Sequence, residues 1–182
     1  MKIFKHLVLI AIATFLTSCS EKQARKPISH SSGSFMKESI DRNKKLNAEE
    51  KVAITKIIQK DTSHIYNISE KGFWYAYQTK STENVFPKKG DVVTFDYEVT
   101  DLYGNSIYTL EELKRQTYYV DKQNIMNGLR NGIKLMHQGD KVKFIFPSQS
   151  AYGYHGDDNK IGTNQPIICI VTLKEIKSET TE

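Results

Sequence analysis

The clearest pattern in this chain is an alternation of apolar and polar positions between residues 93 and 100. The apolar positions are Val93, Phe95, Tyr97 and Val99. Successive side chains of a β-strand point to opposite faces, so this alternation predicts a strand with one buried face. Residues 141–146 alternate in the same way, with Val142, Phe144 and Phe146 apolar, and residues 167–173 form an apolar run. Both segments predict further strands.

Two weaker strands accompany these three. The aromatic run at residues 73–77 follows a turn around Gly72, and residues 106–110 follow a turn around Gly104. Aromatic and β-branched residues are enriched in strands, and glycine marks the turns between them. Together the five segments predict an antiparallel sheet.

A helical period replaces the alternation in residues 127–137. Leu129, Ile133 and Met136 lie on one face of that segment, and Gly139 follows as a helix stop. This short helix can bury one stripe against the sheet. The pattern predicts an α+β domain in which a curved antiparallel sheet wraps around one short helix.

A second helix is predicted near the N-terminus, over residues 48–60. Asn47 can cap it, and Glu50 stands three residues later, as in a capping box. Residues 37–45 carry weaker helix signals because they are strongly charged. These segments predict a helical extension before the sheet.

The first 18 residues have the layout of a secretory signal. Lys2 and Lys5 precede an apolar run at residues 7–16, which is too short for a comfortable membrane span. The run ends in Leu16-Thr17-Ser18-Cys19, which resembles the lipobox of bacterial lipoproteins. That resemblance implies cleavage before Cys19 and lipidation of its thiol; an ordinary signal peptide with a chance cysteine is the alternative.

Two or more acyl chains on Cys19 would hold the protein stably on a membrane. The predicted location is the cell envelope, facing the periplasm. Ser20 is not the aspartate associated with retention in the inner membrane, which favours the outer membrane. The predicted divisions are a signal peptide at residues 1–18, a flexible tether at 19–36, a helical extension with the first strands at 37–87, the main domain at 88–177 and a polar tail at 178–182.

Charge and composition exclude several function classes. The leader removes two of the 26 basic residues and none of the 21 acidic ones, which leaves a net charge of +3. This near balance argues against a nucleic-acid partner. The sequence shows no metal-ligand spacing, nucleotide-binding loop or cofactor motif, so neither a metal nor a cofactor is predicted.

Two isolated features have ordinary structural interpretations. His155 lies beside Asp157 and Asp158 in a loop rich in glycine and asparagine, which indicates an exposed loop rather than a site. Cys169 lies within an apolar strand, where a cysteine behaves as a small buried hydrophobe. Only one cysteine remains after lipidation of Cys19, so no disulfide within the chain is expected.

Several runs occur in order along residues 88–176. They are Lys89-Gly90-Asp91, Ile125-Met126-Asn127-Gly128-Leu129, Gly132 to Met136, Gly139-Asp140-Lys141, Phe146-Pro147 followed by Ala151-Tyr152-Gly153, and Ile161 to Leu173. In these runs the chain resembles the FKBP-type peptidyl-prolyl isomerases. Its layout looks like that of the gliding-motility-associated lipoproteins of that family.

The resemblance implies an active site between the sheet and the short helix. Tyr97 and Tyr152 would act in catalysis, together with the backbone N–H of Ile125 or Met126, which would hold a substrate carbonyl. The substrate-binding residues implied by the resemblance are Ile107, Tyr108, Leu129, Ile161 and Cys169.

Some of these residues depart from the family pattern. Leu129 stands where the family usually has tryptophan, Cys169 where it has phenylalanine, and Ile107 where it has an aromatic residue. Tyr108 replaces an aspartate, which removes a carboxylate from the pocket. The resemblance therefore implies a roomier and less polarising site, with weak activity or a different choice of substrate.

Three functions remain open on the sequence. The first is a membrane-anchored prolyl isomerase that acts on proline-containing exported proteins, including those of a gliding or secretion apparatus. The second is an FKBP-fold binding or chaperone module with little or no turnover. The third is a lipid-anchored structural component that functions through its helical extension. Some relatives dimerise through such an extension, so a dimer of this chain is also open.

Overall fold

One antiparallel sheet of seven strands organises the computed structural model, which describes residues 33–178. The strands are β1 (Asn67–Ile68), β2 (Trp74–Thr79), β3 (Val92–Thr100), β4 (Ser106–Tyr108), β5 (Gln116–Tyr119), β6 (Lys141–Phe146) and β7 (Ile167–Lys177). The α-helices are α2 (Gly33–Lys60), α3 (Leu110–Leu113) and α4 (Asn127–Gly132), and two 3-10 turns cover Ile133–Leu135 and Ser148–Ser150. The predicted combination of an antiparallel sheet, a short helix and a helical extension is confirmed.

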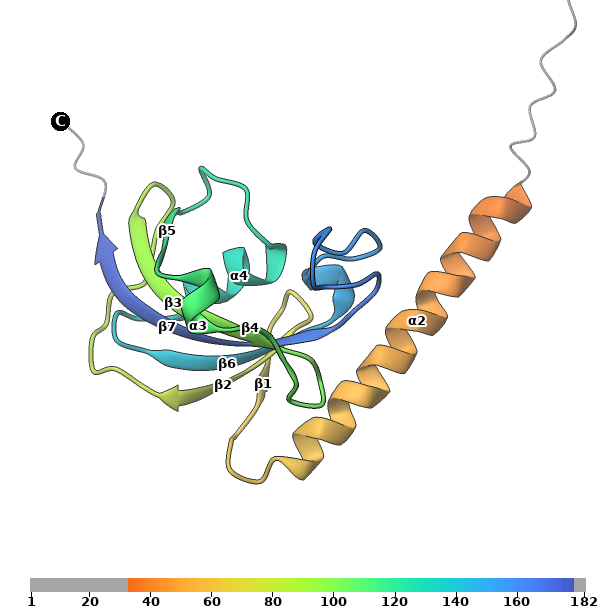
Figure 1. Cartoon of the computed structure of the whole chain (residues 1–182), viewed down its shortest axis with the longest axis horizontal. Helices are drawn as coiled ribbons and strands as arrows, with labels where there is room; N and C mark the ends of the chain where they lie inside the picture. Colours follow the sequence, from red (N-terminus) through yellow and green to blue (C-terminus); the bar gives the residue numbers. More distant parts are fainter. Residues whose placement is uncertain (1–32, 179–182) are drawn as a thin grey trace, which may run out of the picture. The chain divides into compact units, whose positions relative to one another are not determined.

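The strand order is β1-β2-β6-β7-β3-β4, and β5 also pairs with β3. The β3 strand lies antiparallel to β7 along its whole length, from Val92 opposite Lys177 to Thr100 opposite Ile168. On its other side β3 pairs with β5 near its start and with β4 near its end. Figure 1 shows the curvature of this sheet, with α4 on one of its faces.

The main core fills the space between that face and α4. The alternating positions of β3, β6 and β7 point into it, and Leu129, Ile133 and Met136 meet them from the short helix and the turn that follows. All of these helix residues are buried, as their spacing predicts. The helical segment ends at Leu135, and Gly139 instead makes a later turn with φ of 90°.

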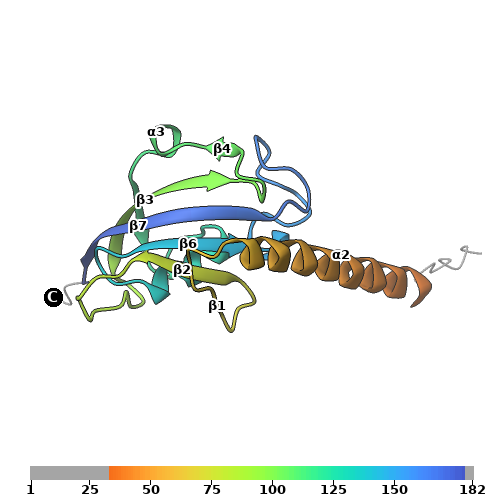
Figure 2. The same ribbon diagram turned by 90° about the horizontal axis from the view of Figure 1, so that it is seen from below.

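The opposite face of the sheet carries a smaller core beneath α2. Ile145 of β6 and Ile168 of β7 pack there with Ile54 of the helix. Side chains one position apart on a strand point to opposite faces, so Ile145 faces α2 while its neighbours Phe144 and Phe146 face α4. Figure 2 shows the C-terminal part of α2 next to the ends of β6 and β2.

The chain divides into two compact units, residues 1–39 and residues 40–182. Of the first unit, the structure describes residues 33–39, which form the start of α2. The helix therefore begins within the segment that the sequence predicts as a tether, and Cys19 lies outside the described residues. All contacts discussed below belong to the second unit.

The predicted start of the helix at Asn47 is wrong. Residues 37–45 belong to the same continuous helix, so Asn47 and Glu50 lie in its interior and make no capping box. Asn47 donates instead from its side-chain amide to Gln149, at 3.5 Å. Glu50 is 6% exposed and accepts hydrogen bonds from the chain that follows β6. Both polar side chains therefore make hydrogen bonds to residues distant in the sequence rather than capping the helix.

The predicted strand over residues 106–110 is shorter than expected and is followed by α3. Thr109 caps α3 in a reciprocal capping box with Glu112, each binding the other's backbone N–H. The Thr-Leu-Glu-Glu sequence carries this signal, which the alternation alone does not show. As a result β4 and β5 form the two halves of one edge, with α3 between them.

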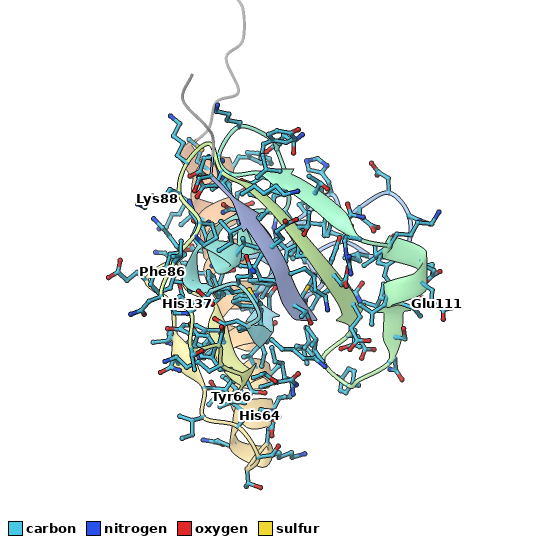
Figure 3. All side chains as sticks on the ribbon, turned by 90° about the vertical axis from the view of Figure 1, so that its left-hand side faces the viewer. His64, Tyr66, Phe86, Lys88, Glu111 and His137 are labelled. Carbon is cyan, nitrogen blue, oxygen red and sulfur yellow. The ribbon has the colours of Figure 1, made fainter. Side chains whose placement is uncertain are left out.

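A polar cluster fixes the end of α2 to the sheet. The Asp61 carboxylate accepts hydrogen bonds from Ser63, from the Tyr66 hydroxyl at 2.7 Å and from the Lys143 ammonium at 3.0 Å. The bond from Ser63, followed by those from Tyr66, His64 and Lys143, holds the pKa of Asp61 far below its usual range. Figure 3 shows His64 and Tyr66 together on this side of the sheet.

Replacing Ile54 by alanine tests the packing of α2 on the sheet. Ile54 is fully buried, and truncating such a side chain costs about 2–5 kcal/mol of the free energy of unfolding. Val52 is 54% exposed on the same helix, so Val52→Ala is the matched control and should change stability by less than about 0.5 kcal/mol. Urea unfolding measures both. Equal effects of the two substitutions would contradict the packing.

Candidate active site

Most of the residues that the sequence singles out lie in one cluster between α4 and the sheet. Leu129, Ile161 and Cys169 belong to the buried core there. Partly buried residues pack against that core, among them Tyr97, Ile107, Tyr108, Ile125 and Met126. Tyr152 stands at the edge and is 36% exposed. The structure thus brings these residues together, while their individual roles stay predictions.

The apolar floor of the cluster depends on a close approach of α4 to the sheet. Gly128 makes this approach, because a Cβ atom added there would lie 2.5 Å from the ring of Phe146. The next residue, Leu129, is consequently buried to 3% exposure beside the core strands. Cys169 of β7 is fully buried in the same core, and burial raises the pKa of its thiol. The thiol therefore stays protonated and acts as an apolar side chain.

Two tyrosines of the cluster, Tyr97 and Tyr152, carry hydroxyl groups near these apolar residues. Burial raises the pKa of Tyr97, and Tyr152, Cys169 and Tyr108 add to the shift in that order. Burial also raises the pKa of Tyr152, with Asp157 as the next cause. Both phenols are therefore neutral near pH 7. Neither hydroxyl makes a hydrogen bond to another residue within the described chain, and each is a donor.

The backbone just before α4 adds further donors. Met126 is the N-cap of that helix, and its side chain makes no capping bond. The N–H groups of Ile125 and Met126 precede the helix, so they lie outside its hydrogen-bond ladder. A substrate carbonyl near these groups would meet backbone donors beside an apolar surface.

A carboxylate that the sequence interpretation missed lies against Tyr108. The Tyr108 hydroxyl donates to Asp157 at 2.5 Å. Asp157 also accepts from the backbone N–H groups of Ile161 at 2.7 Å and Asn159 at 3.0 Å. Tyr108, which stands where the family pattern has an aspartate, thus has the carboxylate of a loop residue bonded to its hydroxyl. Asp157 is partly buried, whereas His155 and Asp158 of the same loop are exposed, as predicted.

Opposing effects act on Asp157. Burial alone would raise the pKa of this carboxyl, but the bond from Tyr108 and the backbone bonds outweigh it, so the pKa lies below its usual range. Burial, followed by the bond to Asp157, raises the pKa of the Tyr108 phenol. The pair is thus a neutral phenol donating to an ionised carboxylate. This charge-assisted bond ties β4 to the loop at residues 153–162.

A second contact joins the same two segments. The Lys160 ammonium lies 5.0 Å from the centre of the Tyr108 ring and forms an ion pair with Glu112 of α3. Ile161, which follows Lys160 directly, lies in the core at 4% exposure. The loop at residues 153–162 is consequently fixed to its neighbours at two points, Asp157 and Lys160.

A separate groove of about 940 Å³ lies between α2 and the sheet. Its apolar lining residues are Ala48, Val52, Ala53, Ile57, Leu102 and Tyr103. Lys45, Lys56, Lys60 and Lys143 line it as well, with Glu49 and Asp61 as the acidic members. The groove lies on the opposite face of the sheet from the tyrosine cluster.

Two further properties concern only the part of the chain that the structure describes. No group of three or more His, Cys, Asp or Glu side chains there is placed to hold a metal ion. Within residues 33–178, no helix combines the length and apolar character needed to cross a membrane.

Comparison with known proteins identifies relatives in sequence. The family described as FKBP-type peptidyl-prolyl cis-trans isomerase matches residues 83–174. The probable FKBP-type peptidyl-prolyl cis-trans isomerase FkpA of Neisseria meningitidis serogroup B is 29% identical over 98 residues, which are 54% of this chain and 36% of that protein. The match therefore spans about a third of that relative.

Solved structures share the fold. The crystal structure of FkpA from Escherichia coli aligns with a TM-score of 0.60 and 20% identity, over 93% of this chain and 81% of that one. A peptidyl-prolyl cis-trans isomerase from Pseudomonas syringae aligns with a TM-score of 0.58 and 19% identity, over 72% and 95%. The FKBP-like fold expected from the sequence is confirmed by these two alignments.

Removing the Tyr108 hydroxyl tests the bond to Asp157. Asp157 has a lower pKa in the folded chain than the ordinary value of about 3.9, so it stabilises the fold above that pH and loses this effect as the pH falls. Tyr108→Phe should raise the pKa of Asp157 and cost about 1 kcal/mol at neutral pH. That difference should shrink below a pH of about 4.

NMR titration of the Asp157 carboxyl measures its pKa. Urea unfolding at pH values between pH 3 and pH 7, spaced roughly one unit apart, measures the difference in stability. Tyr103→Phe is the matched control, since Tyr103 is 91% exposed. An unchanged Asp157 titration in Tyr108→Phe would refute the bond.

Proposed function

Because this chain belongs to the family of FKBP-type peptidyl-prolyl cis-trans isomerases, we propose that it accelerates the cis/trans isomerisation of X–Pro bonds in polypeptide clients. The proposed active site is the cluster of Tyr97, Tyr152, Leu129 and their neighbours between α4 and the sheet. The observation that carries the proposal is that two neutral tyrosines, Tyr97 and Tyr152, lie within electrostatic reach of one core residue, Cys169.

The reaction suits such a site because it needs no nucleophile, metal or cofactor. Rotation about an X–Pro bond breaks amide resonance and must cross a barrier of about 18–20 kcal/mol. The planar amide is more polar than the twisted one. Apolar surroundings therefore disfavour the ground state relative to the transition state, and each tenfold acceleration needs about 1.4 kcal/mol of such difference.

Each part of the cluster has a role in this proposal. The proline ring packs on Leu129. The Tyr152 hydroxyl and the N–H of Ile125 or Met126 bind the carbonyls that flank the rotating bond, and Tyr97 forms a wall. Ile161 and Ile107 border the bound residue. Each of these contacts orients the substrate without forming a covalent bond.

The substitutions in the cluster bear on rate and specificity. Leu129 presents less surface than the tryptophan of the family pattern, so we expect weaker packing against a bound proline ring, while the fully buried Cys169 lies beneath the surface that such a ring would contact. The Asp157 carboxylate, bound by Tyr108, supplies a charge near the rim. We therefore expect a broad choice of residues before proline and moderate turnover.

A second candidate function has its own observation. The groove beside α2 combines apolar residues, such as the 54% exposed Val52, with more lysines than acidic residues. An unfolded client segment with apolar and acidic side chains fits that chemistry. In this alternative the protein holds clients on α2, and isomerisation is weak or absent.

The proposal includes an envelope location, which rests on the sequence of residues 1–20. Lipidation of Cys19 would anchor the protein in the outer membrane, facing the periplasm, where exported proteins fold. The layout shared with gliding-motility-associated lipoproteins suggests clients in a motility or secretion apparatus. Self-association through α2, which exposes Phe35, Met36 and Ile40, also stays a prediction.

Replacing Tyr152 by phenylalanine tests the active site. If the hydroxyl binds a substrate carbonyl, its loss should lower kcat/KM for an X–Pro peptide by about fivefold, because one hydrogen bond contributes about 1 kcal/mol. NMR exchange spectroscopy on the protein in mild detergent measures the isomerisation directly. The matched control is Tyr154→Phe, two residues away and 72% exposed, which should leave the rate unchanged. Absence of acceleration by the folded wild type, over several residues before proline, would exclude the enzyme and favour the binding alternative.

A further inference from the structure

Glu50 of α2 is an unusual buried carboxylate. It is 6% exposed, and it accepts hydrogen bonds from the backbone N–H of Ser148 at 2.9 Å and from the Ser148 hydroxyl at 2.5 Å. Ser148 itself is 2% exposed. A buried carboxylate is costly unless hydrogen bonds satisfy it, and an apolar residue would often stabilise such a position as well. The carboxylate at this position provides a specific hydrogen-bonded link between Glu50 and Ser148, which lie 98 positions apart in the sequence.

Ser148 passes this link on to the backbone around Tyr152. Its carbonyl accepts the N–H of Ala151 at 3.0 Å and the N–H of Gly153 at 2.8 Å. These two residues flank Tyr152 on either side. The turn that presents the Tyr152 ring is therefore bonded to Ser148 before and after the tyrosine, while Glu50 holds Ser148 from the other direction.

Packing fixes the distance between the helix and this turn. Ile54 lies one helical turn after Glu50, on the same face, and packs with Ile145. Ile145 lies three residues before Ser148 on the strand that leads into the turn. Asn47, on the preceding turn of α2, contacts Gln149. Three successive turns of the helix thus touch β6 or the segment just after it.

We propose that Glu50 is a positioning residue for the prolyl isomerase reaction, which acts through Ser148 to fix the Tyr152 hydroxyl. This inference rests on the proposed function. It also implies that the catalytic unit extends beyond residues 83–174, which match the family, and includes α2. Without the Glu50 carboxylate, the turn at residues 147–153 keeps its own backbone hydrogen bonds but loses its hydrogen bonds to α2. The Tyr152 side chain then samples a wider range of positions.

The test compares Glu50→Ala with Glu50→Gln and with Glu38→Ala in the complete protein, extracted in mild detergent. Glutamine can accept from the Ser148 N–H and donate to its hydroxyl, so it should restore the link. Glu38 is exposed on the same helix and serves as the matched control. The readouts are kcat/KM for an X–Pro peptide and the ring NMR signal of Tyr152, assigned by its loss in Tyr152→Phe.

We expect Glu50→Ala to shift or broaden the Tyr152 signal and to lower kcat/KM by about tenfold, since small displacements of a catalytic group have large effects on rate. Glu50→Gln and Glu38→Ala should resemble the wild type. In a Tyr152→Phe background, Glu50→Ala should lower kcat/KM little further, because two residues that act through one hydroxyl are not additive.

A purely structural Glu50 would give a different result. Glu50→Ala would then lower the unfolding midpoint but leave the Tyr152 signal and kcat/KM unchanged, which would overturn the proposal. If Glu50→Ala does not fold, Ser148→Ala removes one of the two bonds, and an unaltered Tyr152 signal in that variant would overturn the proposal equally. A wild type without isomerase activity would refute the proposed function alone, because the Tyr152 signal still reports on the link.

Discussion

The structure depends on the pairing of β6 with β7, because this pair is buried on both faces. Its six paired positions run from Lys141 opposite Thr172 to Phe146 opposite Ile167. Phe144, Phe146 and Cys169 point toward α4, whereas Ile145 and Ile168 point toward α2. A shift of one residue in this pairing would exchange the two faces. The tyrosine cluster and the helix contact would then be lost together.

Each face of the pair contributes to the candidate site. The face toward α4 supplies the apolar floor, on which neutral tyrosines can donate hydrogen bonds without introducing charge. The face toward α2 holds the helix that carries Glu50 and so anchors the turn before Tyr152. The proposed chemistry, in which a weakly polar site favours the twisted amide, requires both an apolar surface and well-placed donors.

Local patterns predict much of this architecture from the sequence. The alternation in β3 and β6 and the spacing of Leu129, Ile133 and Met136 reflect burial on one face, which periodicity records directly. The buried, apolar character of Cys169 follows from the same reasoning. The resemblance in the segment around Ala151-Tyr152-Gly153 adds the residues that the structure gathers into one cluster.

The contacts that the sequence does not reveal are those that join distant segments. Glu50 fits a local capping box in the sequence, yet in the structure it binds Ser148. Asp157 looks like one more acidic residue of a polar loop, yet it accepts the Tyr108 hydroxyl. In both cases the partner is decided by the packing of whole elements, which no short window of sequence contains. The capping box at Thr109 and Glu112 is different, because its local signal was present in the sequence.

The most direct test of the central claim is to map a bound proline-containing peptide on the protein by NMR. The account predicts contacts between the proline ring and the methyl groups of Leu129, with shifts of Tyr97 and Tyr152 and little change along the groove beside α2. Contacts confined to that groove, around Val52 and Ile57, would contradict the account and identify the protein as a binding module on an isomerase fold.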